Sequence, residues 1–383
     1  LLSRRQRQMC IRDSACYMLT LVDDYDYAME LVDLAAFGTI ADVAPLIGEN
    51  RSIVKRALRQ MRSCWYKREG VKALYDGPLD RITAEDIAFK IAPCINASGR
   101  LDVRGADLPL LLLLEDRPGI AEFLAERLTD CNNCRKSIQK EWCNRMEETA
   151  LKMIEQGDKV LVLLADGAPS GVVGLVAGNL KEKYNRPTIV FAPKQDSSGK
   201  TVWTGSGRSI KGFHLLNALK TCEDFFLAYG GHELAAGMSI PENEEVLSQL
   251  RTRLNQVAEY LSETDIMPMT YWDTEITEAE LTNSLYEELK SLEPFGEGVK
   301  KPVFKMRMHL LPKRHMLMGA DKSHLKLFCE NYSAVGFSLA DKYIHSELPE
   351  VIDALGYPCE NYFNGKVKQE FMLVDFEPVT ENE

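Results

Sequence analysis

The sequence has 383 residues, 45% of them hydrophobic and 27% charged, which is enough chain for two or three domains with buried cores. Its formal net charge of −11 at pH 7 argues against a nonspecific coat on nucleic acid, but it allows a local basic channel and clustered carboxylates for divalent metals. No apolar run approaches the roughly 20 residues of a membrane span. The ten cysteines form no repeated pairs, which is typical of a reduced cytosolic protein.

Residues 4–14 read Arg-Arg-Gln-Arg-Gln-Met-Cys-Ile-Arg-Asp-Ser and differ in character from the rest of the chain. They resemble an in-frame translation of an adapter used in sequencing libraries, so we exclude residues 1–14 from the fold. The alternative is a native basic arm that binds nucleic acid. If the run is an adapter, we expect the natural protein to continue upstream of Ala15.

The next segment begins with a helical pattern of hydrophobic residues, which we expect to break at Gly38. A strand-like run comes after it, and Asp42 lies at the end of that run. A new helix is expected to open near Glu49, because hydrophobic residues recur on one face from there to Met61.

Thr83 and Asp86 predict another helix start, since they have the spacing of a capping box. We expect Pro93 to end this helix, because proline disrupts a helix interior. Residues 96–100, Asn-Ala-Ser-Gly-Arg, are then interpreted as a small-residue loop.

A long helical pattern runs from Pro118 to about Gln156, with the widely spaced hydrophobic positions of a helix that bridges domains. The chain then alternates between strands and helices, which indicates an α/β unit of about 100 residues. The expected strands are 160–164, 188–192 and 202–204, and the expected helices are 171–180, 215–219 and 246–261.

After Pro268 the chain becomes β-rich. Strand-like runs occur at 303–311, 325–329, 334–337 and 370–376, and Asn364-Gly365 is the strongest turn signal. About five short strands over roughly 115 residues suit a small barrel such as an OB fold.

Two glycine-containing segments carry the clearest chemistry: residues 205–209, Gly-Ser-Gly-Arg-Ser, and residues 230–237, Gly-Gly-His-Glu-Leu-Ala-Ala-Gly. We interpret both as small-residue loops in which backbone N–H groups can approach the oxygens of a phosphate. Arg208 adds a planar, permanently charged group. His232 adds a second side chain that can be cationic, although a lone histidine is more often structural.

Asp42 and Arg100 are further candidates. A carboxylate such as Asp42 can ligate Mn²⁺ or Mg²⁺, but capping a turn is the commoner role. Arg100 follows a glycine and can clamp a phosphate, but a solvated surface arginine is also common. Spacing alone leaves both alternatives open.

Taken in order, the motifs resemble the RecJ branch of the DHH phosphoesterases over residues 16–383. The resemblance also includes residues 292–298, Leu-Glu-Pro-Phe-Gly-Glu-Gly, ahead of the β-rich region. It implies a single-stranded-DNA-specific 5′→3′ exonuclease of DNA repair and recombination, which hydrolyses phosphodiester bonds with two Mn²⁺ or Mg²⁺ ions.

The resemblance implies an α/β protein with four parts. They are a remnant of the DHH catalytic domain at 15–117, a linker helix at 118–157, the DHH-associated phosphate-binding domain at 158–264 and an OB-fold domain at 265–383.

The resemblance also assigns roles to residues. Asp42 would be a metal ligand and catalytic residue, and His232 would donate a hydrogen bond at the scissile phosphate. Ser206 and Arg208 would hold the terminal 5′ phosphate. The other substrate-binding residues that it implies are Asn96, Arg100, Ser209, Gly230 and Gly231.

The chain departs from the family in one large respect, because the upstream metal motifs, including Asp-His-His itself, are not in it. Asp24 and Asp26 have a tempting spacing, but they lie within a helical pattern. We therefore expect this chain to bind metal ions weakly and to be inactive by itself. Residues 168–170, Ala-Pro-Ser, also stand where many members carry a histidine.

The resemblance implies single-stranded DNA with a 5′ end as the binding partner. It adds single-strand-binding protein and a helicase as candidate protein partners, and it implies a monomer in the bacterial cytoplasm with no membrane association. Two other functions stay open. A DHH phosphodiesterase of short oligonucleotides or cyclic dinucleotides would lack the long linker helix and the terminal barrel. A non-catalytic nucleic-acid-binding scaffold would keep both without metal chemistry.

Overall fold

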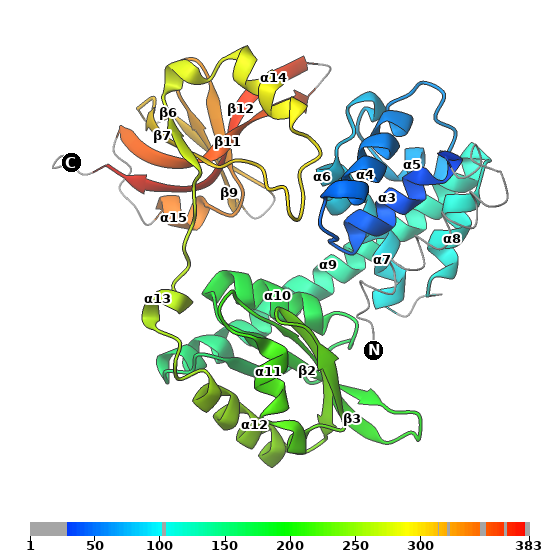
Figure 1. The fold of residues 1–383 in the computed structure, drawn as a ribbon, viewed down its shortest axis with the longest axis vertical. Helices are drawn as coiled ribbons and strands as arrows, with labels where there is room; N and C mark the ends of the chain where they lie inside the picture. Colours follow the sequence, from blue (N-terminus) through cyan, green and yellow to red (C-terminus); the bar gives the residue numbers. More distant parts are fainter. Residues whose placement is uncertain are drawn as a thin grey trace. The chain divides into compact units, whose positions relative to one another are not determined.

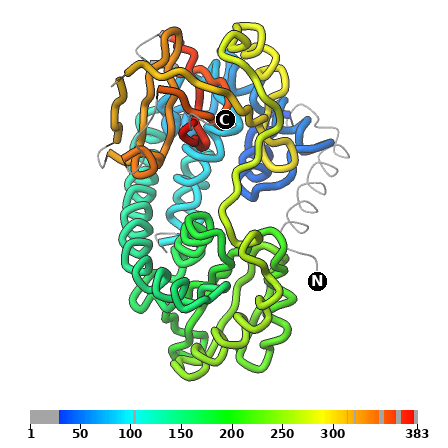
Figure 2. Tube along the Cα trace, turned by 90° about the vertical axis from the view of Figure 1, so that its left-hand side faces the viewer, coloured from blue at the N-terminus to red at the C-terminus, as the bar shows by residue number. Residues whose placement is uncertain are grey.

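The structure is a computed structural model, which describes residues 29–101, 105–312, 314–319, 322–344, 350–363 and 366–379. The adapter-like run and Asp24 to Asp26 lie outside these residues. The chain divides into two compact units, whose elements can be followed in Figures 1 and 2. The first unit contains the described residues up to Ala44 together with Arg56–Pro268, and the barrel unit contains Pro45–Lys55 together with the described residues from Met269 onward. Within the described ranges, no helix is both long and apolar enough to cross a bilayer.

The first part of the chain is helical. Its elements are α3 (Val32–Ala41), α4 (Gly48–Met61), α5 (Glu69–Leu74), η1 (Leu79–Arg81), α6 (Ala84–Asp86), η2 (Ile87–Ile91), α7 (Ala92–Arg100), α8 (Asp107–Leu114) and α9 (Pro118–Glu155). The long helix predicted from Pro118 is confirmed as α9, which has 38 residues. Buried side chains of α7, α8 and α9 share one core cluster, which fixes the three helices to one another.

Helix α3 does not break at Gly38, so the expected strand-like run before Asp42 is wrong. A glycine in a helix interior costs only about 1 kcal/mol relative to alanine. Phe37 and Ile40 are buried beside it, and their packing outweighs that cost. Asp42 is therefore the residue that ends a helix rather than one that follows a strand.

The predicted capping box is confirmed, since the Thr83 hydroxyl accepts from the Asp86 N–H while the Asp86 carboxylate accepts from the Thr83 N–H. The expected helix end at Pro93 is wrong, because α7 continues through it to Arg100. The π-helical turn η2 comes directly before, and there the Ala92 N–H bonds to the Ile87 carbonyl five residues back. This wider turn accommodates a proline that would otherwise collide with the carbonyl four residues earlier.

The rest of the first unit is built on a five-stranded sheet with the order β1-β2-β3-β5-β4. Its strands are β1 (Leu161–Leu164), β2 (Thr188–Gln195), β3 (Thr201–Arg208), β4 (Ala228–Gly231) and β5 (Ala235–Pro241). The β1–β2 pair is parallel and the other pairs are antiparallel. Its helical elements are α10 (Val173–Tyr184), α11 (Leu215–Lys220), η3 (Glu223–Phe225), α12 (Glu244–Val257) and α13 (Glu263–Ile266).

The sheet is covered by helices on both faces. On one face Leu161 and Val190 pack with α10 and with the C-terminal half of α9. On the other face Val162 and Ile189 pack with α11 and α12. This arrangement confirms the expected α/β unit, and it attaches α9 to the sheet as well as to the helical part (Figure 1).

The two glycine-containing segments are strands rather than the expected loops. Residues 205–208 complete β3, and residues 230–231 and 235–237 belong to β4 and β5. The two glycines inside β3 serve close packing: a Cβ on Gly205 would lie 2.6 Å from the Phe191 ring, and one on Gly207 would lie 2.7 Å from Leu215. These glycines therefore let larger neighbours approach the strand, and they do not form turns.

In the barrel unit the described strands form a sheet with the order β6-β7-β11-β12-β10-β9-β8. These strands are β6 (Thr274–Ile276), β7 (Phe304–His309), β8 (His315–Met318), β9 (His324–Phe328), β10 (Ser333–Gly336), β11 (Val351–Phe363) and β12 (Lys366–Pro378). Short helices η4 (Glu278–Glu280), α14 (Asn283–Ser291) and α15 (Ala340–Ile344) accompany them.

The barrel fold is that expected of an OB domain, with β10 and β12 parallel and the other pairs from β7 to β8 antiparallel. Met308, Leu325, Ile352 and Phe371 lie in its core. The sequence missed β6, β8 and the long β11. The predicted Asn364-Gly365 turn lies outside the described residues, although its neighbours on β11 and β12 pair with each other.

Candidate phosphate-binding site

Around Ser206, one face of strands β3, β5 and β4 carries only small side chains apart from one arginine. Antiparallel register places Ser206 opposite Gly237 and Gly237 opposite Gly230, while Arg208 lies opposite Ala235. Residues two apart on a strand point to the same face. We call this set the small-residue face; it consists of Thr204, Ser206, Arg208, Ala228, Gly230, Ala235, Gly237 and Ser239. Each of these residues is at least partly exposed, so a ligand can approach the backbone here.

Arg208 is held against this face by its own strand. Its Nη1 donates to Ser206 Oγ at 3.0 Å and to the Gly207 carbonyl at 2.8 Å. Gly174, in the first turn of α10, makes room for both side chains, because a Cβ there would lie 2.8 Å from Ser206 Oγ and 3.2 Å from Arg208 Nη2. The N-terminal end of α10, which carries a partial positive charge, therefore adjoins the arginine.

Arg100 reaches the same region from the C-terminal end of α7. Its Nη1 donates to the Gly171 carbonyl at 3.4 Å, and a Cβ on Gly171 would lie 2.0 Å from the Arg100 carbonyl oxygen. Burial and then the charge of Arg100 lower the pKa of Arg208 from its usual value. Asn96 is exposed one helical turn before Arg100, on the same side of α7.

Two arginines from different elements therefore converge beside Ser206 and a helix N-terminus. Neither an aspartate nor a glutamate pairs with Arg208 among the described residues, and its hydrogen bonds there go to Ser206 and Gly207. Such an arrangement suits a phosphate, which accepts from several guanidinium N–H groups at once.

The remaining predicted residues of the two segments have different surroundings. Ser209 is buried, and its hydroxyl donates to the Phe213 carbonyl at 2.7 Å. A Cβ on Gly231 would lie 2.4 Å from the Ala235 carbonyl oxygen, so glycine allows the tight turn between β4 and β5. His232 lies exposed in that turn, and its N–H donates to the same carbonyl at 2.8 Å. Ser209 thus supports the end of β3, whereas His232 is accessible from solvent.

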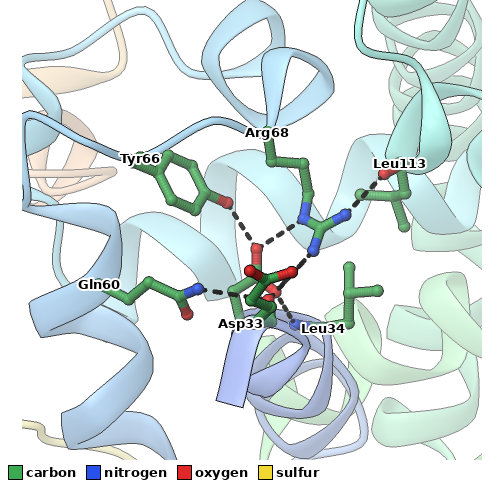
Figure 3. Close-up of polar contacts among 7 residues, drawn as sticks. Asp33, Leu34, Gln60, Tyr66, Arg68 and Leu113 are labelled. Carbon is green, nitrogen blue, oxygen red and sulfur yellow. Dashed lines mark hydrogen bonds and ion pairs between the residues drawn. The ribbon is translucent and has the colours of Figure 1, made fainter. Parts of the chain in front are cut away.

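Asp42 caps the C-terminal end of α3, where its N–H donates to the Gly38 carbonyl at 3.1 Å. The other end of α3 is anchored by Asp33, a fully buried carboxylate shown in Figure 3. Arg68 Nε donates to Asp33 Oδ2 at 2.6 Å and Arg68 Nη1 donates to the Leu113 carbonyl at 2.9 Å. One buried ion pair therefore joins α3 to the start of α5 and to the end of α8.

Tyr66 completes this group, since its hydroxyl donates to Asp33 Oδ2 at 2.8 Å (Figure 3). Burial, followed by the charge of Asp33, raises the pKa of Tyr66, so the phenol remains a donor. The sequence analysis did not identify Asp33, Tyr66 or Arg68, because nothing in their spacing distinguishes a buried ion pair from solvated charges.

The donor set for a metal ion is incomplete in the described part of the chain. No three His, Cys, Asp or Glu side chains come together there in a way that could hold a cation. The described residues therefore do not fit a two-metal centre by themselves, and the metal-binding role of Asp42 stays a prediction.

Comparisons with known proteins agree with the fold. The model of the DHHA1 domain matches residues 157–260, and that of the RecJ OB domain matches residues 272–375. The RecJ exonuclease of Bacillus subtilis is 33% identical over 362 residues, which cover 90% of this chain and 44% of that protein. The Escherichia coli protein of the same name is 34% identical over 317 residues, covering 79% and 52% respectively.

Over most of its length the chain is similar to RecJ proteins. A crystal structure of Thermus thermophilus RecJ in complex with Mg²⁺ aligns with a TM-score of 0.72 and 31% identity, over 92% of this chain and 53% of that one. The complex of the same RecJ with Mn²⁺ aligns with a TM-score of 0.71. The resemblance and the fold class predicted from the motifs are confirmed. The chain spans about half the length of these RecJ relatives.

The proteins that carry the RecJ name are described as single-stranded-DNA-specific exonucleases. No comparison tests the individual site residues, so their roles stay predictions; they are Asp42, Asn96, Arg100, Ser206, Arg208, Ser209, Gly230, Gly231 and His232. The residue that the sequence analysis missed at this site is Gly174. Residues 171–180 are rich in glycine, alanine and valine, a composition that suits close packing on a sheet, but it does not identify the side chains that lie against Gly174.

Proposed function

We propose that this chain is part of a single-stranded-DNA-specific 5′→3′ exonuclease of DNA repair and recombination. Within that enzyme it supplies the site that binds the 5′ phosphate of the strand. The observation that carries the proposal is the convergence of Arg100 and Arg208 beside Ser206, with no carboxylate paired to Arg208 in the described residues. A phosphate would neutralise this excess of positive charge. Ser206 Oγ, which accepts from Arg208, keeps its own proton for donation to the ligand.

In this proposal the roles follow from position. Arg208 and Ser206 bind the terminal phosphate, and Arg100 binds a phosphate further along the strand. The small-residue face lets the sugar–phosphate backbone lie close to β3, β4 and β5. His232, exposed in the turn beside that face, donates to the oxygen on which negative charge develops.

Mn²⁺ or Mg²⁺ would activate water and stabilise the leaving oxygen in such an enzyme. Since the described residues do not assemble a metal centre, no hydrolytic step is assigned to them. Asp42 is the ligand that we propose this chain contributes. We also propose that the chain by itself binds the strand without cutting it.

The barrel unit favours a long single strand as the ligand over a dinucleotide or a very short oligonucleotide. It provides an OB fold, and Phe337 on it is 58% exposed with the His324 ring 5.0 Å away in an edge-on arrangement. An exposed ring of this kind can stack on a base without regard to sequence. The presence of this unit and of α9 argues against a phosphodiesterase limited to dinucleotides. We further propose that the protein is monomeric and cytoplasmic. The cytoplasmic location follows from its proposed substrate, because the enzyme must have access to single-stranded DNA.

Fluorescence anisotropy with labelled oligonucleotides tests the proposal. We expect this chain to bind a 5′-phosphorylated dT strand more tightly than the same strand with a 5′ hydroxyl, and more tightly than a blunt duplex. With Mn²⁺ added, the strand should stay intact. Equal affinity for all three nucleic acids would refute the 5′-phosphate site.

A nuclease assay addresses the exonuclease itself. The same strand should be degraded from its 5′ end when the assay uses a protein in which this chain follows the Asp-His-His region of a RecJ relative. If that protein binds the strand and never cuts it, the scaffold function is favoured and Asp42 loses its proposed role.

A further inference from the structure

Arg135 is a buried cation on α9 that neither the motifs nor the family resemblance singled out. Its side chain is only 9% exposed. Its guanidinium donates to Gln139 Oε1 at 2.6 Å and to Asn132 Oδ1 at 2.5 Å, and both acceptors are neutral amides. Among the described residues, no carboxylate forms an ion pair with it. A buried charge without a partner of opposite sign is costly, so its presence calls for a function.

The packing of α7 on α9 brings Arg135 alongside Arg100. At one end of this contact Asn132 Nδ2 lies 3.3 Å from Cys94 Sγ, within α7. At the other end Leu101, which follows Arg100, packs against the cluster that contains Trp142 of α9. Arg135 lies between Asn132 and Trp142 on α9, just as Arg100 lies between Cys94 and Leu101.

The electrostatic consequences agree with this geometry. Burial and then the charge of Arg100 lower the pKa of Arg135, and the same two causes in the same order lower that of Arg208. Arg100 therefore stands between two further cations, one on α9 and one on β3. The three arginines come from three different elements, so their repulsion is imposed by the fold rather than by one flexible segment.

We propose that Arg135 is a positioning residue for the strand: it raises the positive potential at Arg100 and so strengthens the binding of a DNA phosphate there. Because Arg135 is buried and its guanidinium is engaged by two amides, it acts through its charge and not through contact with the strand. The inference rests on the proposed function. It predicts that Arg135 lowers the stability of the free protein and raises its affinity for the DNA strand.

The test uses the full chain and three variants. Arg135→Gln removes the charge and Arg135→Lys keeps it. Arg127→Gln removes an equal charge from an exposed position on the same helix and serves as the control. For each protein, the melting temperature is measured alone and with a 5′-phosphorylated dT strand, and affinity is measured over a range of NaCl concentrations.

We expect Arg135→Gln to melt no lower than the wild type when free, because it loses an uncompensated charge. It should bind the strand several-fold more weakly at low salt. The slope of log affinity against log salt should become shallower by less than about 0.7, the value for one lost phosphate contact on a single strand, because Arg135 does not contact the strand itself. Arg135→Lys should restore most of the affinity. Arg127→Gln should match the wild type in both measurements.

The other outcomes separate the two hypotheses. If the wild type does not bind the strand, the proposed function fails and this inference fails with it. If the wild type binds and Arg135→Gln binds equally well, only the inference fails. A large drop in the melting temperature of free Arg135→Gln, or a lysine variant as weak as the glutamine variant, would mean that Arg135 has a packing role and would also overturn the inference.

Discussion

The guanidinium of Arg208 donates a hydrogen bond of 3.0 Å to the hydroxyl of Ser206, two residues earlier on the same strand. The two side chains thus form one unit on the small-residue face, and the first turn of α10 lies against them at Gly174. Ordinarily an arginine in such a partly buried position would pair with a carboxylate. Its pairing with a hydroxyl leaves the positive charge available to a ligand.

Arg208→Gln should therefore remove the preference for a 5′-phosphorylated strand. A charge-assisted hydrogen bond contributes about 1.5–3 kcal/mol, so we expect affinity for the phosphorylated strand to fall roughly tenfold or more. Affinity for the 5′-hydroxyl strand should change little. Arg253→Gln is the control, because Arg253 lies on α12 on the opposite face of the sheet. Equal losses for both strands would show that Arg208 does not read the terminal phosphate.

The phosphate site stays a prediction from the sequence, and the local structure of its residues differs from the expected loops. Residues 205–209 indicated phosphate binding because glycine and arginine occur together, and that chemistry does not depend on whether the segment is a loop or a strand. The strand assignment depends on Phe191 and Leu215, which pack where the glycine side chains would be. Those contacts are distant in sequence, and local propensity cannot reveal them.

The same limit explains the helical errors. Thr83 and Asp86 interact within one turn, so their capping box could be recognised from spacing alone. The effect of Pro93 depends on the wide turn before it, which the propensities of single residues do not encode. The buried pair of Asp33 and Arg68 could not be foreseen either, since 35 positions separate its members.

Gly174→Ala should weaken strand binding without unfolding the protein. The added methyl group would lie 2.8 Å from Ser206 Oγ and 3.2 Å from Arg208 Nη2, so these side chains must move away from their positions on the small-residue face. Gly178→Ala is a matched control on the same helix, because a Cβ there meets nothing within 4 Å. That control should bind normally and gain up to about 1 kcal/mol of helix stability. Identical binding by the two variants would refute the proposed role of Gly174.

Asp33→Ala should destabilise the helical part of the first unit strongly. Removing one partner of a buried ion pair typically costs about 3–5 kcal/mol, because the other charge remains buried without compensation. Arg68 and Tyr66 would both lose their acceptor. Hydrogen exchange of α3 and α5 amides in urea would measure the loss. Lys72→Ala breaks a partly exposed pair with Glu69 and should cost no more than about 1 kcal/mol. If both variants lost the same unfolding free energy, the buried ion pair of Asp33 would not be a main source of stability in the helical part.

The barrel unit should lose stability in acid through Glu370, which is only 3% exposed. Burial alone would raise the pKa of Glu370, but hydrogen bonds from Lys326, Asn361 and Ser333 and the charge of Lys326 outweigh it and lower that pKa. A folded-state pKa below the unfolded value of about 4.3 means that this contribution is present above that pH. It is lost as the pH falls through the folded-state value.

Glu370→Gln should consequently be less stable than the wild type at pH 7, because Lys326 loses the carboxylate that accepts from its Nζ at 2.5 Å. Between pH 5 and pH 3, its stability should fall less steeply than that of the wild type, since one acid-sensitive group is gone. Urea unfolding followed by the fluorescence of a probe on the barrel unit would measure both effects. Glu377→Gln, at an exposed position on the same strand, should keep the wild-type slope. Parallel pH profiles for Glu370→Gln and the wild type would show that the acid sensitivity of the barrel arises elsewhere.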